Sequence, residues 1–255
     1  MTEAVPHLGL ISAMHEEQAG LIAMMRNHET VSRGMRDYVS GTLWGIRCTC
    51  VLSRLGKAAA ATTAAMLIER FNVTHVVFTG VAGAVDRSVS VGDVVVADAL
   101  VQHDMDVTPL FPRFEVPLLG MARFPADALL AGHLSEAVRA YLDHDLQHAI
   151  SAPERSAFSI RQPRLHRGLI ASGDQFIGSQ ATLDGLKAEL PDLLAVEMEG
   201  AAVAQVCHEF GVPVGVVRTI SDDANEHAPV DFMKFIERVA SQYTFHIVRR
   251  LCTRV

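Results

Sequence analysis

The sequence lacks the features of a nucleic-acid-binding or membrane protein. Its 22 Lys and Arg are outnumbered by 29 Asp and Glu, and its only basic cluster is Arg249-Arg250 with Arg254. Because binding to a phosphate backbone needs clustered cations, we expect no nucleic-acid partner. No apolar run is long enough to span a bilayer, and residues 1–6 lack the basic start and apolar core of a signal peptide. We therefore expect a cytoplasmic protein with no membrane partner.

Cysteine is also scarce, and the few cysteines are not spaced as metal ligands. The four are Cys48, Cys50, Cys207 and Cys252. No CxxC pair and no matching His pair is present, so we expect reduced thiols. His103 with Asp104 and Asp106 resembles a ligand group, but no further spaced ligands accompany it. We expect hydrogen-bonded structure there, and neither a metal nor another cofactor.

The overall composition is that of a folded chain. Hydrophobic residues make up 49% and charged residues 20%, and mean hydropathy is +0.23. A disordered chain would have low hydrophobicity and high net charge. The 255 residues suit one large α/β domain, so we expect residues 1–255 to form a single domain.

Strand-like and helix-like segments alternate along the chain. Strands are predicted at 8–12, 38–43, 46–52, 75–79, 93–97, 165–171, 193–196 and 212–219. Helices are predicted at 16–25, 57–71, 126–148, 200–210 and 229–251. This alternation predicts a three-layer αβα sandwich with a central mixed, largely parallel sheet. Ligands of such folds lie at the carboxyl ends of the strands, where the polar residues are therefore of most interest.

Carboxylates follow at least three of the predicted strands. Glu16 and Glu17 come after the first, Glu197 and Glu199 lie where a strand becomes a helix, and Asp222 follows the last strand. Each could be an ordinary first-turn acid or N-cap. Together they would repel one another at one sheet edge unless a ligand or cation offset their charge. Arg218 and Lys57 are available cations, so ordinary ion pairing explains part of the set.

The sequence resembles the methylthioadenosine/S-adenosylhomocysteine nucleosidases of the nucleoside phosphorylase superfamily over nearly the whole chain. The resemblance lies in Gly9-Leu-Ile-Ser-Ala-Met-His-Glu-Glu17, Leu55-Gly-Lys57, Thr79-Gly-Val-Ala-Gly83, Val91-Gly-Asp-Val-Val95, His103-Asp-Met-Asp-Val107, Ser172-Gly-Asp-Gln-Phe-Ile177, Val196-Glu-Met-Glu199 and Val217-Arg-Thr-Ile-Ser-Asp222. The Val-Glu-Met-Glu and Ile-Ser-Asp segments, in this order and spacing, are the specific ones. The resemblance implies cleavage of the N-glycosidic bond between adenine and a 5′-thio-substituted ribose.

The resemblance also implies roles for individual residues. Asp222 would be the general acid at adenine N7, and Glu17 would hold and activate the attacking water. Phe176 would stack on adenine, and Glu199 would accept from the ribose hydroxyls. The remaining predicted substrate-binding residues are Ile177, whose backbone would read the base edge, Met198 against the ribose, Ser221 supporting Asp222, and Val81, Gly83 and Glu197.

Such a set of residues makes chemical sense. Cleavage passes through a ribose cation, so an anion beside the sugar stabilises the transition state more than the ground state. Adenine leaves poorly as an anion, so a carboxylic acid whose pKa is raised by burial can donate the proton it needs. One acid and one water-activating base parallel the inverting glycosidases.

Phosphorolysis is the main alternative. Related phosphorylases typically have Arg where this chain has Phe78, and His15-Glu16-Glu17 would repel a phosphate dianion. We therefore favour water as the nucleophile. Two departures from the nucleosidase pattern bear on this choice: Val81 replaces a serine, and Arg54 replaces a glycine. Arg54 could bind an anion such as phosphate, or form a surface salt bridge.

Further alternatives concern the substrate and the partner. The 5′ group could differ, as in aminodeoxyfutalosine, or the protein could bind nucleosides without turnover. The segment 109–117 is rich in proline and apolar residues, which is typical of an interface. By the resemblance, the chain would be a homodimer in which Leu110, Phe111 and Pro117 approach the partner's 5′-substituent pocket. The alternative is a loop that packs on its own subunit.

Overall fold

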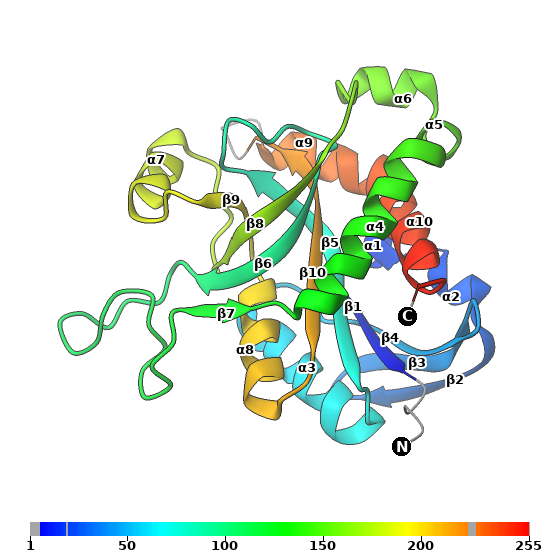
Figure 1. The fold of residues 1–255 in the computed structure, drawn as a ribbon, viewed down its shortest axis with the longest axis horizontal. Coiled ribbons are helices and arrows are strands. Elements are labelled where there is room, and N and C mark those ends of the chain that lie inside the picture. The colour runs from blue at the N-terminus through cyan, green and yellow to red at the C-terminus, as the bar shows by residue number, and fades with distance from the viewer. Residues whose placement is uncertain (1–5, 19, 224–227, 255) are drawn as a thin grey trace.

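The computed structural model describes residues 6–18, 20–223 and 228–254, and it shows a mixed sheet covered by helices on both faces (Figure 1). The strands are β1 (His7–Ser12), β2 (Arg26–Arg33), β3 (Arg36–Leu43), β4 (Ile46–Leu52), β5 (His75–Ala84), β6 (Val94–Gln102), β7 (Arg123–Pro125), β8 (Leu165–Ser172), β9 (Leu193–Glu197) and β10 (Val214–Asp222). The helices are α1 (His15–Gln18), α2 (Leu21–Met24), α3 (Lys57–Phe71), α4 (Ala128–His144), α5 (Leu146–Ala149), α6 (Ala152–Ala157), α7 (Gln180–Glu189), α8 (Gly200–Phe210), α9 (Ala228–Phe235), a π-helical segment (Ile236–Ala240) and α10 (Ser241–Leu251). The predicted α/β class is confirmed.

The sheet is parallel at its centre and partly closes on itself. Strands β4, β1, β5 and β10 pair in parallel in that order, while β2 and β3 extend one edge as an antiparallel meander. On the other side β6, β8 and β9 pair in parallel, β10 pairs with β6, and β5 pairs with β9. These pairings join β5, β10, β6, β8 and β9 into a closed ring of strands. The ends of β5, β9 and β10 meet in one region, because Gly83 pairs with Val196 of β9 and with Asp222 of β10.

Helices cover the two faces of the sheet as the layered fold requires. On one face α3 packs beside α8, and α4 and α10 pack together on the other (Figure 1). Leu67 and Val203 belong to the apolar cluster on the first side, and Leu134 and Ile247 to the cluster on the second. Burial of these apolar side chains is the main force that holds the helices on the sheet.

Local sequence signals explain several element boundaries. The hairpin between β3 and β4 turns at Trp44 and Gly45, which both have positive φ (45° and 93°), as a two-residue type I′ turn requires. Helix α8 ends at Gly211, whose φ of 66° places it in the left-handed region that favours glycine. Helix α4 begins after Asp127, whose side chain accepts a hydrogen bond from the N–H of Leu130 at 2.8 Å.

Several predicted elements differ from those observed: the strand predicted at 93–97 runs on to Gln102 as β6, and the helix predicted at 126–148 is α4 and α5. The helix predicted at 16–25 is two short helices, and Gly20 between them has a φ of 89°, which helical backbone excludes. The last helix contains the π-helical segment. Strand β5 continues beyond residue 79 to Ala84, because β10 pairs with it as far as Gly83 and β9 pairs with its end.

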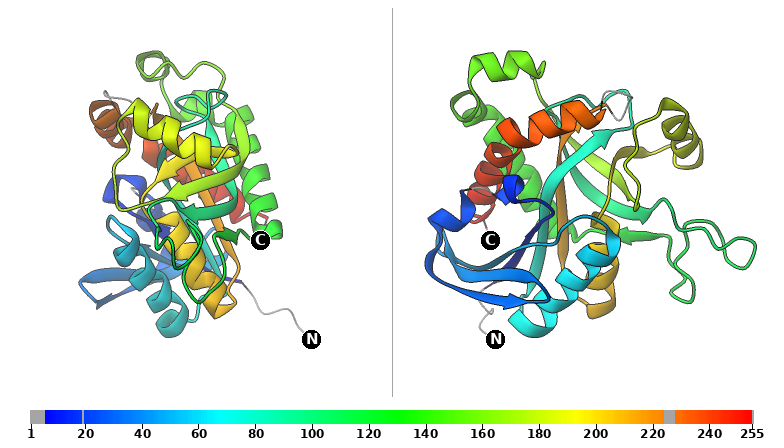
Figure 2. Two further views of the ribbon diagram at one scale, coloured as in Figure 1. Left: turned by 90° about the vertical axis from the view of Figure 1, so that its left-hand side faces the viewer. Right: turned by 180° about the vertical axis from the view of Figure 1, so that it is seen from behind.

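The loop between β6 and β7, residues 103–122, extends away from the rest of the chain (Figures 1 and 2). Four of its positions are proline or glycine, which prevents a regular ladder there: Pro109, Pro112, Pro117 and Gly120. Leu110 and Leu118 are 79% and 94% exposed in the single chain. Leu110 and Leu118 therefore give the loop an exposed apolar surface.

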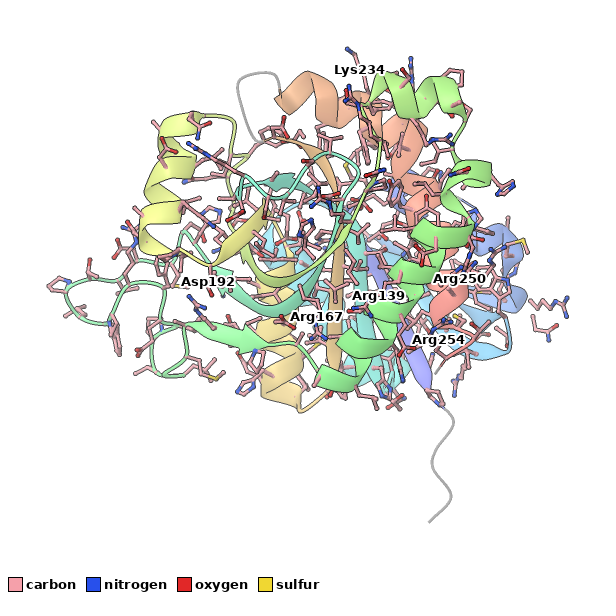
Figure 3. The ribbon with its side chains drawn as sticks, turned by 45° about the horizontal axis from the view of Figure 1, so that its top comes forward. Arg139, Arg167, Asp192, Lys234, Arg250 and Arg254 are labelled. Carbon is pink, nitrogen blue, oxygen red and sulfur yellow. The ribbon has the colours of Figure 1, made fainter. Side chains whose placement is uncertain are left out.

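The basic residues near the C-terminus are neutralised within the fold. Arg250 of α10 contacts Asp145 at 2.6 Å, and Arg254 approaches Glu136 of α4 at 3.4 Å (Figure 3). These pairs fasten α10 to the end of α4 rather than offering free cations. Among the described residues, we find no helix with both the length and the apolar character needed to cross a bilayer.

Candidate active site

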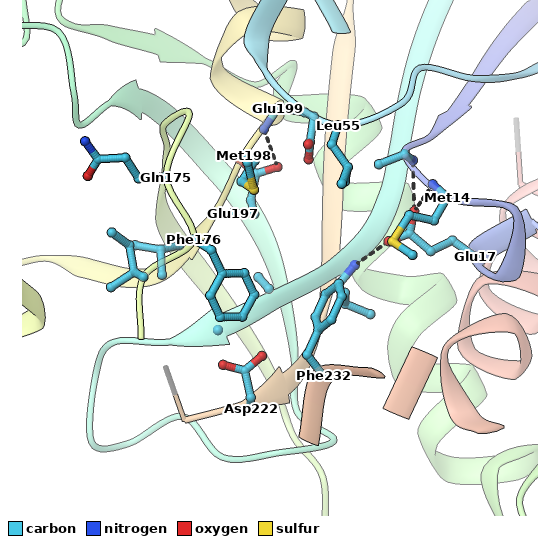
Figure 4. Close-up of a pocket in the computed structure, with 16 residues that line it drawn as sticks. Met14, Glu17, Leu55, Gln175, Phe176, Glu197, Met198, Glu199, Asp222 and Phe232 are labelled. Atoms are coloured by element: carbon cyan, nitrogen blue, oxygen red, sulfur yellow. Dashed lines mark hydrogen bonds between the residues drawn. The ribbon is translucent and has the colours of Figure 1, made fainter. Parts of the chain in front are cut away.

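A cleft with about 680 Å³ of empty volume, its open mouth included, lies at the carboxyl ends of β1, β5, β9 and β10 (Figure 4). Its lining comprises Ala13, Met14, Glu17, Leu55, Val81, Ala82, Gly83, Gln175, Phe176, Ile177, Val196, Glu197, Met198, Glu199, Asp222 and Phe232. All of the predicted catalytic and substrate-binding residues except Ser221 belong to this lining. Four carboxyl groups therefore face one largely apolar cavity.

Glu17 is buried and held by backbone donors. Its Oε2 accepts hydrogen bonds from the N–H groups of Ala13 (2.8 Å) and Met14 (2.9 Å), and its Oε1 accepts from Val81 (3.1 Å). Burial raises the pKa of Glu17 above its ordinary value, although Arg218 and these three N–H donors offset part of the rise. Val81 contributes its backbone to this arrangement, so the missing hydroxyl at this position leaves the hold on Glu17 intact.

Glu197 belongs to a buried ion pair rather than to the free edge of the cleft. Arg218 donates to Glu197 from Nε at 3.1 Å and from Nη2, and Ser172 donates to the same carboxylate. The guanidinium carbon of Arg218 lies 4.0 Å from the centre of the Phe78 ring, in a cation–π contact. The prediction that ion pairing accounts for part of the acidic set is correct at this position.

Gly80 leaves room for the charges at the centre of the site. A Cβ atom at this residue would lie 2.4 Å from Arg218 Nη1 and 2.8 Å from Glu17 Oε1. Both approaches are too close for a real side chain, so any other residue would displace one of the two charged groups. The strand position of Gly80 thus sets how near Arg218 and Glu17 can come to each other.

Glu199 lies just before α8 and is buried. Its Oε1 accepts a hydrogen bond from the N–H of Gly56 at 2.8 Å. Burial, together with the neighbouring charge of Glu197, raises the pKa of Glu199 to about 8. An acid with this pKa is largely protonated at pH 7 in the empty cleft, and a cation placed beside it would favour the ionised form.

Asp222 ends β10 and is buried, with its carboxyl group facing the cleft (Figure 4). The hydroxyl of Ser221 donates to Asp222 Oδ2 at 2.7 Å. Ser221 therefore does not line the cleft but contacts the carboxylate that does, which agrees with its predicted supporting place. Asp222 comes from β10, whereas Glu17 lies in α1 and Glu199 precedes α8, so the three carboxyl groups reach the cavity from different elements.

An aromatic pair forms one wall of the cleft. Phe176 is 47% exposed, and its ring meets that of Phe232 edge-on with 5.7 Å between centroids. Ile177 is buried beside it, and Met198 lies between the two glutamates of β9 and α8. Phe176 thus lines the cleft with a partly exposed ring, and its stacking on adenine stays a prediction.

Sequence reasoning missed Phe232 and Leu55, and it overvalued Arg54. Phe232 reads as an ordinary apolar helix position, and nothing in its neighbourhood signals a cleft. The Arg54 side chain is exposed, and its Nη2 donates to the carbonyl of Met35 at 2.5 Å. Arg54 does not line the cleft, so its suggested anion contact at the site is not found. Leu110, Phe111 and Pro117 lie in the β6–β7 loop, outside this chain's cleft.

Of the possible metal ligands noted in the sequence, the two aspartates have other partners, and Nε2 of His103 is buried without a hydrogen-bond partner among the described residues. Asp104 pairs with Lys57 at 2.5 Å, and Asp106 accepts from Thr108. Within residues 6–18, 20–223 and 228–254, no group of three or more His, Cys, Asp and Glu side chains is arranged to hold a metal ion.

Comparisons with known proteins agree with this geometry. The model of the phosphorylase superfamily matches residues 7–253. A methylthioadenosine/S-adenosylhomocysteine nucleosidase of Anoxybacillus flavithermus is 38% identical over 236 residues, which cover 92% of this chain and 93% of the relative. The chain belongs to the methylthioadenosine/S-adenosylhomocysteine nucleosidase family of the phosphorylase superfamily. The predicted membership is confirmed, and with it the class of N-glycosyl hydrolases.

Solved structures place the chain in the same nucleosidase family. The Neisseria meningitidis nucleosidase in complex with methylthio-immucillin-A has a TM-score of 0.85 and 32% identity, covering 98% of this chain and 99% of that one. The futalosine hydrolase of Helicobacter pylori has a TM-score of 0.84 and 30% identity, covering 98% and 99%. The two neighbours are almost equally similar to this chain, so overall likeness does not separate their substrates.

Proposed function

We propose that residues 1–255 form a single domain that hydrolyses the N-glycosidic bond of 5′-thio-substituted adenosines such as methylthioadenosine and S-adenosylhomocysteine. Adenine and the corresponding thioribose would be the products. The observation that carries the proposal is that Glu17, Glu199 and Asp222 face one cleft from three elements (Figure 4). Family membership supports the reaction class.

Asp222 is assigned the protonation of the leaving group. A protonated Asp222 donates its proton to N7 of adenine as the glycosidic bond stretches, so that the base leaves neutral. Ser221 orients the carboxyl group through its hydrogen bond. Phe176 stacks on the base, Ile177 reads its edge through the backbone, and Gly83 lets the base approach β5. This set would hold the purine while the proton is transferred.

The two glutamates act on the ribose and on the nucleophile, Glu199 on the ribose and Glu17 on the water. The ionised form of Glu199 accepts from the ribose hydroxyls and stabilises the positive charge that develops on the sugar, with Met198 packed against it. Glu17 holds the water and takes its proton, and the raised pKa of Glu17 makes it a stronger base than an exposed carboxylate. Glu197 keeps Arg218 in place beside these groups.

Water rather than phosphate is the proposed nucleophile. None of the described residues that line the cleft is Lys or Arg, and the nearby Arg218 is already paired with Glu197. A phosphate dianion would meet four carboxyl groups without a free cation. In phosphate-free buffer we expect methylthioadenosine to yield adenine and methylthioribose, measured by chromatography. Added phosphate should not raise the rate. A strict need for phosphate, with a ribose 1-phosphate product, would support a phosphorylase instead.

A nucleosidase for another 5′-substituted adenosine is the second candidate, because the futalosine hydrolase is structurally as similar as the nucleosidases. Comparing kcat/KM for methylthioadenosine, S-adenosylhomocysteine and aminodeoxyfutalosine in the same assay decides between them. Binding of all three without adenine release would point to a non-catalytic nucleoside-binding protein.

The β6–β7 loop is proposed to complete the site of a partner subunit in a cytoplasmic homodimer. Leu110, Phe111 and Pro117 would approach the thio end of a nucleoside bound in the partner. Leu110 is highly exposed in the single chain, which supports burial against a second copy.

A charge placed in this loop should therefore weaken both assembly and catalysis. We expect Leu110→Asp to shift the mass measured by light scattering from dimer toward monomer, because burying a charge in an apolar interface is costly. It should also raise KM by about tenfold, the cost of losing one apolar anchor. Leu129→Asp, at a 69% exposed leucine on α4, is the matched control and should change neither value. A fully active wild-type monomer would contradict the shared site.

A further inference from the structure

Three motifs of the family resemblance have no role in the chemistry proposed above, yet they meet beside the cleft. Lys57 begins α3, Asp104 begins the β6–β7 loop, and Asp174 lies in the loop after β8. Lys57 Nζ contacts Asp104 Oδ1 at 2.5 Å, Asp104 Oδ2 accepts from the N–H of Asp174 at 2.9 Å, and Asp174 Oδ1 accepts from the N–H of Lys57 at 2.8 Å. These contacts form a closed cycle of three residues, which we call the clamp.

One side of the clamp fixes the N-terminus of α3. Gly56 precedes this helix and has no side chain to cap it, so the first N–H groups need partners from elsewhere. The N–H of Lys57 donates to Asp174 Oδ1, and the N–H of Gly56 donates to Glu199 Oε1, each at 2.8 Å. Gly56 has a φ of 93°, and a Cβ there would lie 3.0 Å from Asp174 Oδ1. The Gly56 donor is therefore held in place partly through Asp174.

The other side of the clamp seats the loop that carries Phe176. A Cβ at Gly173 would lie 2.3 Å from the ring of His103, so the loop rests directly on the end of β6. Asp174, the next residue, ties this loop to Asp104 through its N–H and to α3 through its carboxylate. Burial opposes ionisation of Asp104, but Lys57 and the Asp174 N–H hold the pKa of Asp104 below its ordinary value. Asp104 thus stays ionised at neutral pH.

We propose that Lys57, Asp104 and Asp174 are positioning residues that aim the Gly56 N–H at Glu199 and seat the Phe176 loop, so that the ribose side and the base side of the cleft are set as one unit. The inference rests on the proposed function for its catalytic meaning. None of the three residues lines the cleft. Their effect on the reaction must therefore pass through Gly56 and through the loop.

The sign of the change in the pKa of Glu199 separates a positioning role from a purely electrostatic effect. Asp174 is an anion, so its removal would by charge alone favour ionisation of Glu199 and lower the pKa of Glu199. Loss of the aimed Gly56 N–H acts in the opposite direction, because that donor stabilises the ionised form. The other charged groups that act on Glu199 are Glu197, Arg218 and Glu17, and they stay in place in the variant.

The first experiment measures the protonation of Glu199 directly in the ligand-free protein. The pKa of Glu199 is measured by NMR titration of ¹³C-labelled carboxyl groups, with the Glu199→Gln spectrum for assignment. We expect Asp174→Ala to raise this pKa by about half a unit or more. Asp174→Asn retains an oxygen that can accept from Lys57 and should restore most of the wild-type value. Asp184→Ala, at an exposed aspartate on α7, is the matched control and should leave it unchanged.

The second experiment follows catalysis with methylthioadenosine. Asp174→Ala should lower kcat/KM by about tenfold, because both sides of the cleft would be misplaced. In the pH profile of kcat/KM, the acidic limb should move to higher pH. The double variant with Asp104→Ala should be no worse than the poorer single variant, because both break one cycle. Wild-type protein that releases no adenine would refute the proposed function, while the titration of Glu199 would still decide the inference.

An unchanged or lowered pKa of Glu199 in Asp174→Ala would overturn the inference, as would multiplicative losses in the double variant. Asp174 is exposed, so its alanine variant should fold, and a melting curve checks this. If it does not fold, Asp104→Ala tests the same cycle from its other side, and because it also removes an anion, charge alone would again lower the pKa of Glu199. That variant should raise the pKa of Glu199 in the same direction, and a failure to do so would equally overturn the proposal.

Discussion

Replacing Asp222 by asparagine is expected to lower kcat for adenine release by about a hundredfold or more, because an amide cannot give a proton to the departing base. The melting temperature should stay nearly unchanged, since the asparagine oxygen can still accept the hydrogen bond from Ser221. Asp223→Asn is the matched control, because this neighbouring residue is exposed and does not line the cleft. Steady-state assays and melting curves on the three proteins measure both effects.

A substrate with a stable leaving group separates the acid from the base. With a 5-methylthioribosyl p-nitrophenyl compound the leaving group departs as an anion, so Asp222→Asn should recover most of the wild-type rate. Glu17→Gln should lose about a hundredfold or more on both substrates, because water must be activated in either case. An Asp222→Asn variant that turns over methylthioadenosine at the wild-type rate would contradict the assigned role. So would a variant that fails equally on both substrates.

The sequence predicted the elements that have strong local signals. The alanine-rich segment Lys57–Phe71 is a helix with the predicted bounds, and Gly211 ends α8 as expected. These features depend on propensity and capping, which a short window of sequence contains. The helix predicted at 16–25 failed because glycine tolerates both helical and left-handed backbone, and only the fold decides which one Gly20 adopts.

The closure of the sheet could not be predicted from the sequence. The sequence predicts that the strand beginning at His75 ends at residue 79, before Gly80. In the structure residues 80–84 continue β5, because β10 and β9 pair with them from chain positions more than a hundred residues away. Long-range pairing of this kind leaves no local pattern. The same pairing brings Val81 to Glu17 and so completes the site.

The four carboxylates of the cleft were all predicted, whereas some of its apolar residues, Phe232 and Leu55 among them, were missed. Glu17, Glu199 and Asp222 stood out because carboxylates at strand ends need an explanation. Phe232 did not, because a phenylalanine in a helix is an ordinary core residue. Arg54 was considered as an anion contact. Its backbone has a left-handed φ of 70°, and its side chain donates to the carbonyl of Met35, outside the lining of the cleft.

The buried pair of Arg218 and Glu197 should be the most destabilising one to break. Arg218→Met would leave Glu197 as a buried charge without its cation, which costs about 3–5 kcal/mol of unfolding free energy. For a chain of this size the melting temperature should fall on the order of 10 °C. The variant should also lose activity, because Arg218 lowers the pKa of both Glu17 and Glu199 against the effect of burial. Denaturant titration and melting curves measure the loss.

Two comparisons show whether the cost comes from the unpaired charge. Arg123→Met breaks an ion pair of the same type with Asp192, at 2.6 Å but with side chains 45% and 56% exposed, and should cost at most about 1 kcal/mol. Adding Glu197→Gln to Arg218→Met removes the orphaned charge and should recover part of the stability, though not the activity. If Arg218→Met and Arg123→Met were equally mild, Glu197 would have to reach water in the variant, and burial would not be what makes this pair strong.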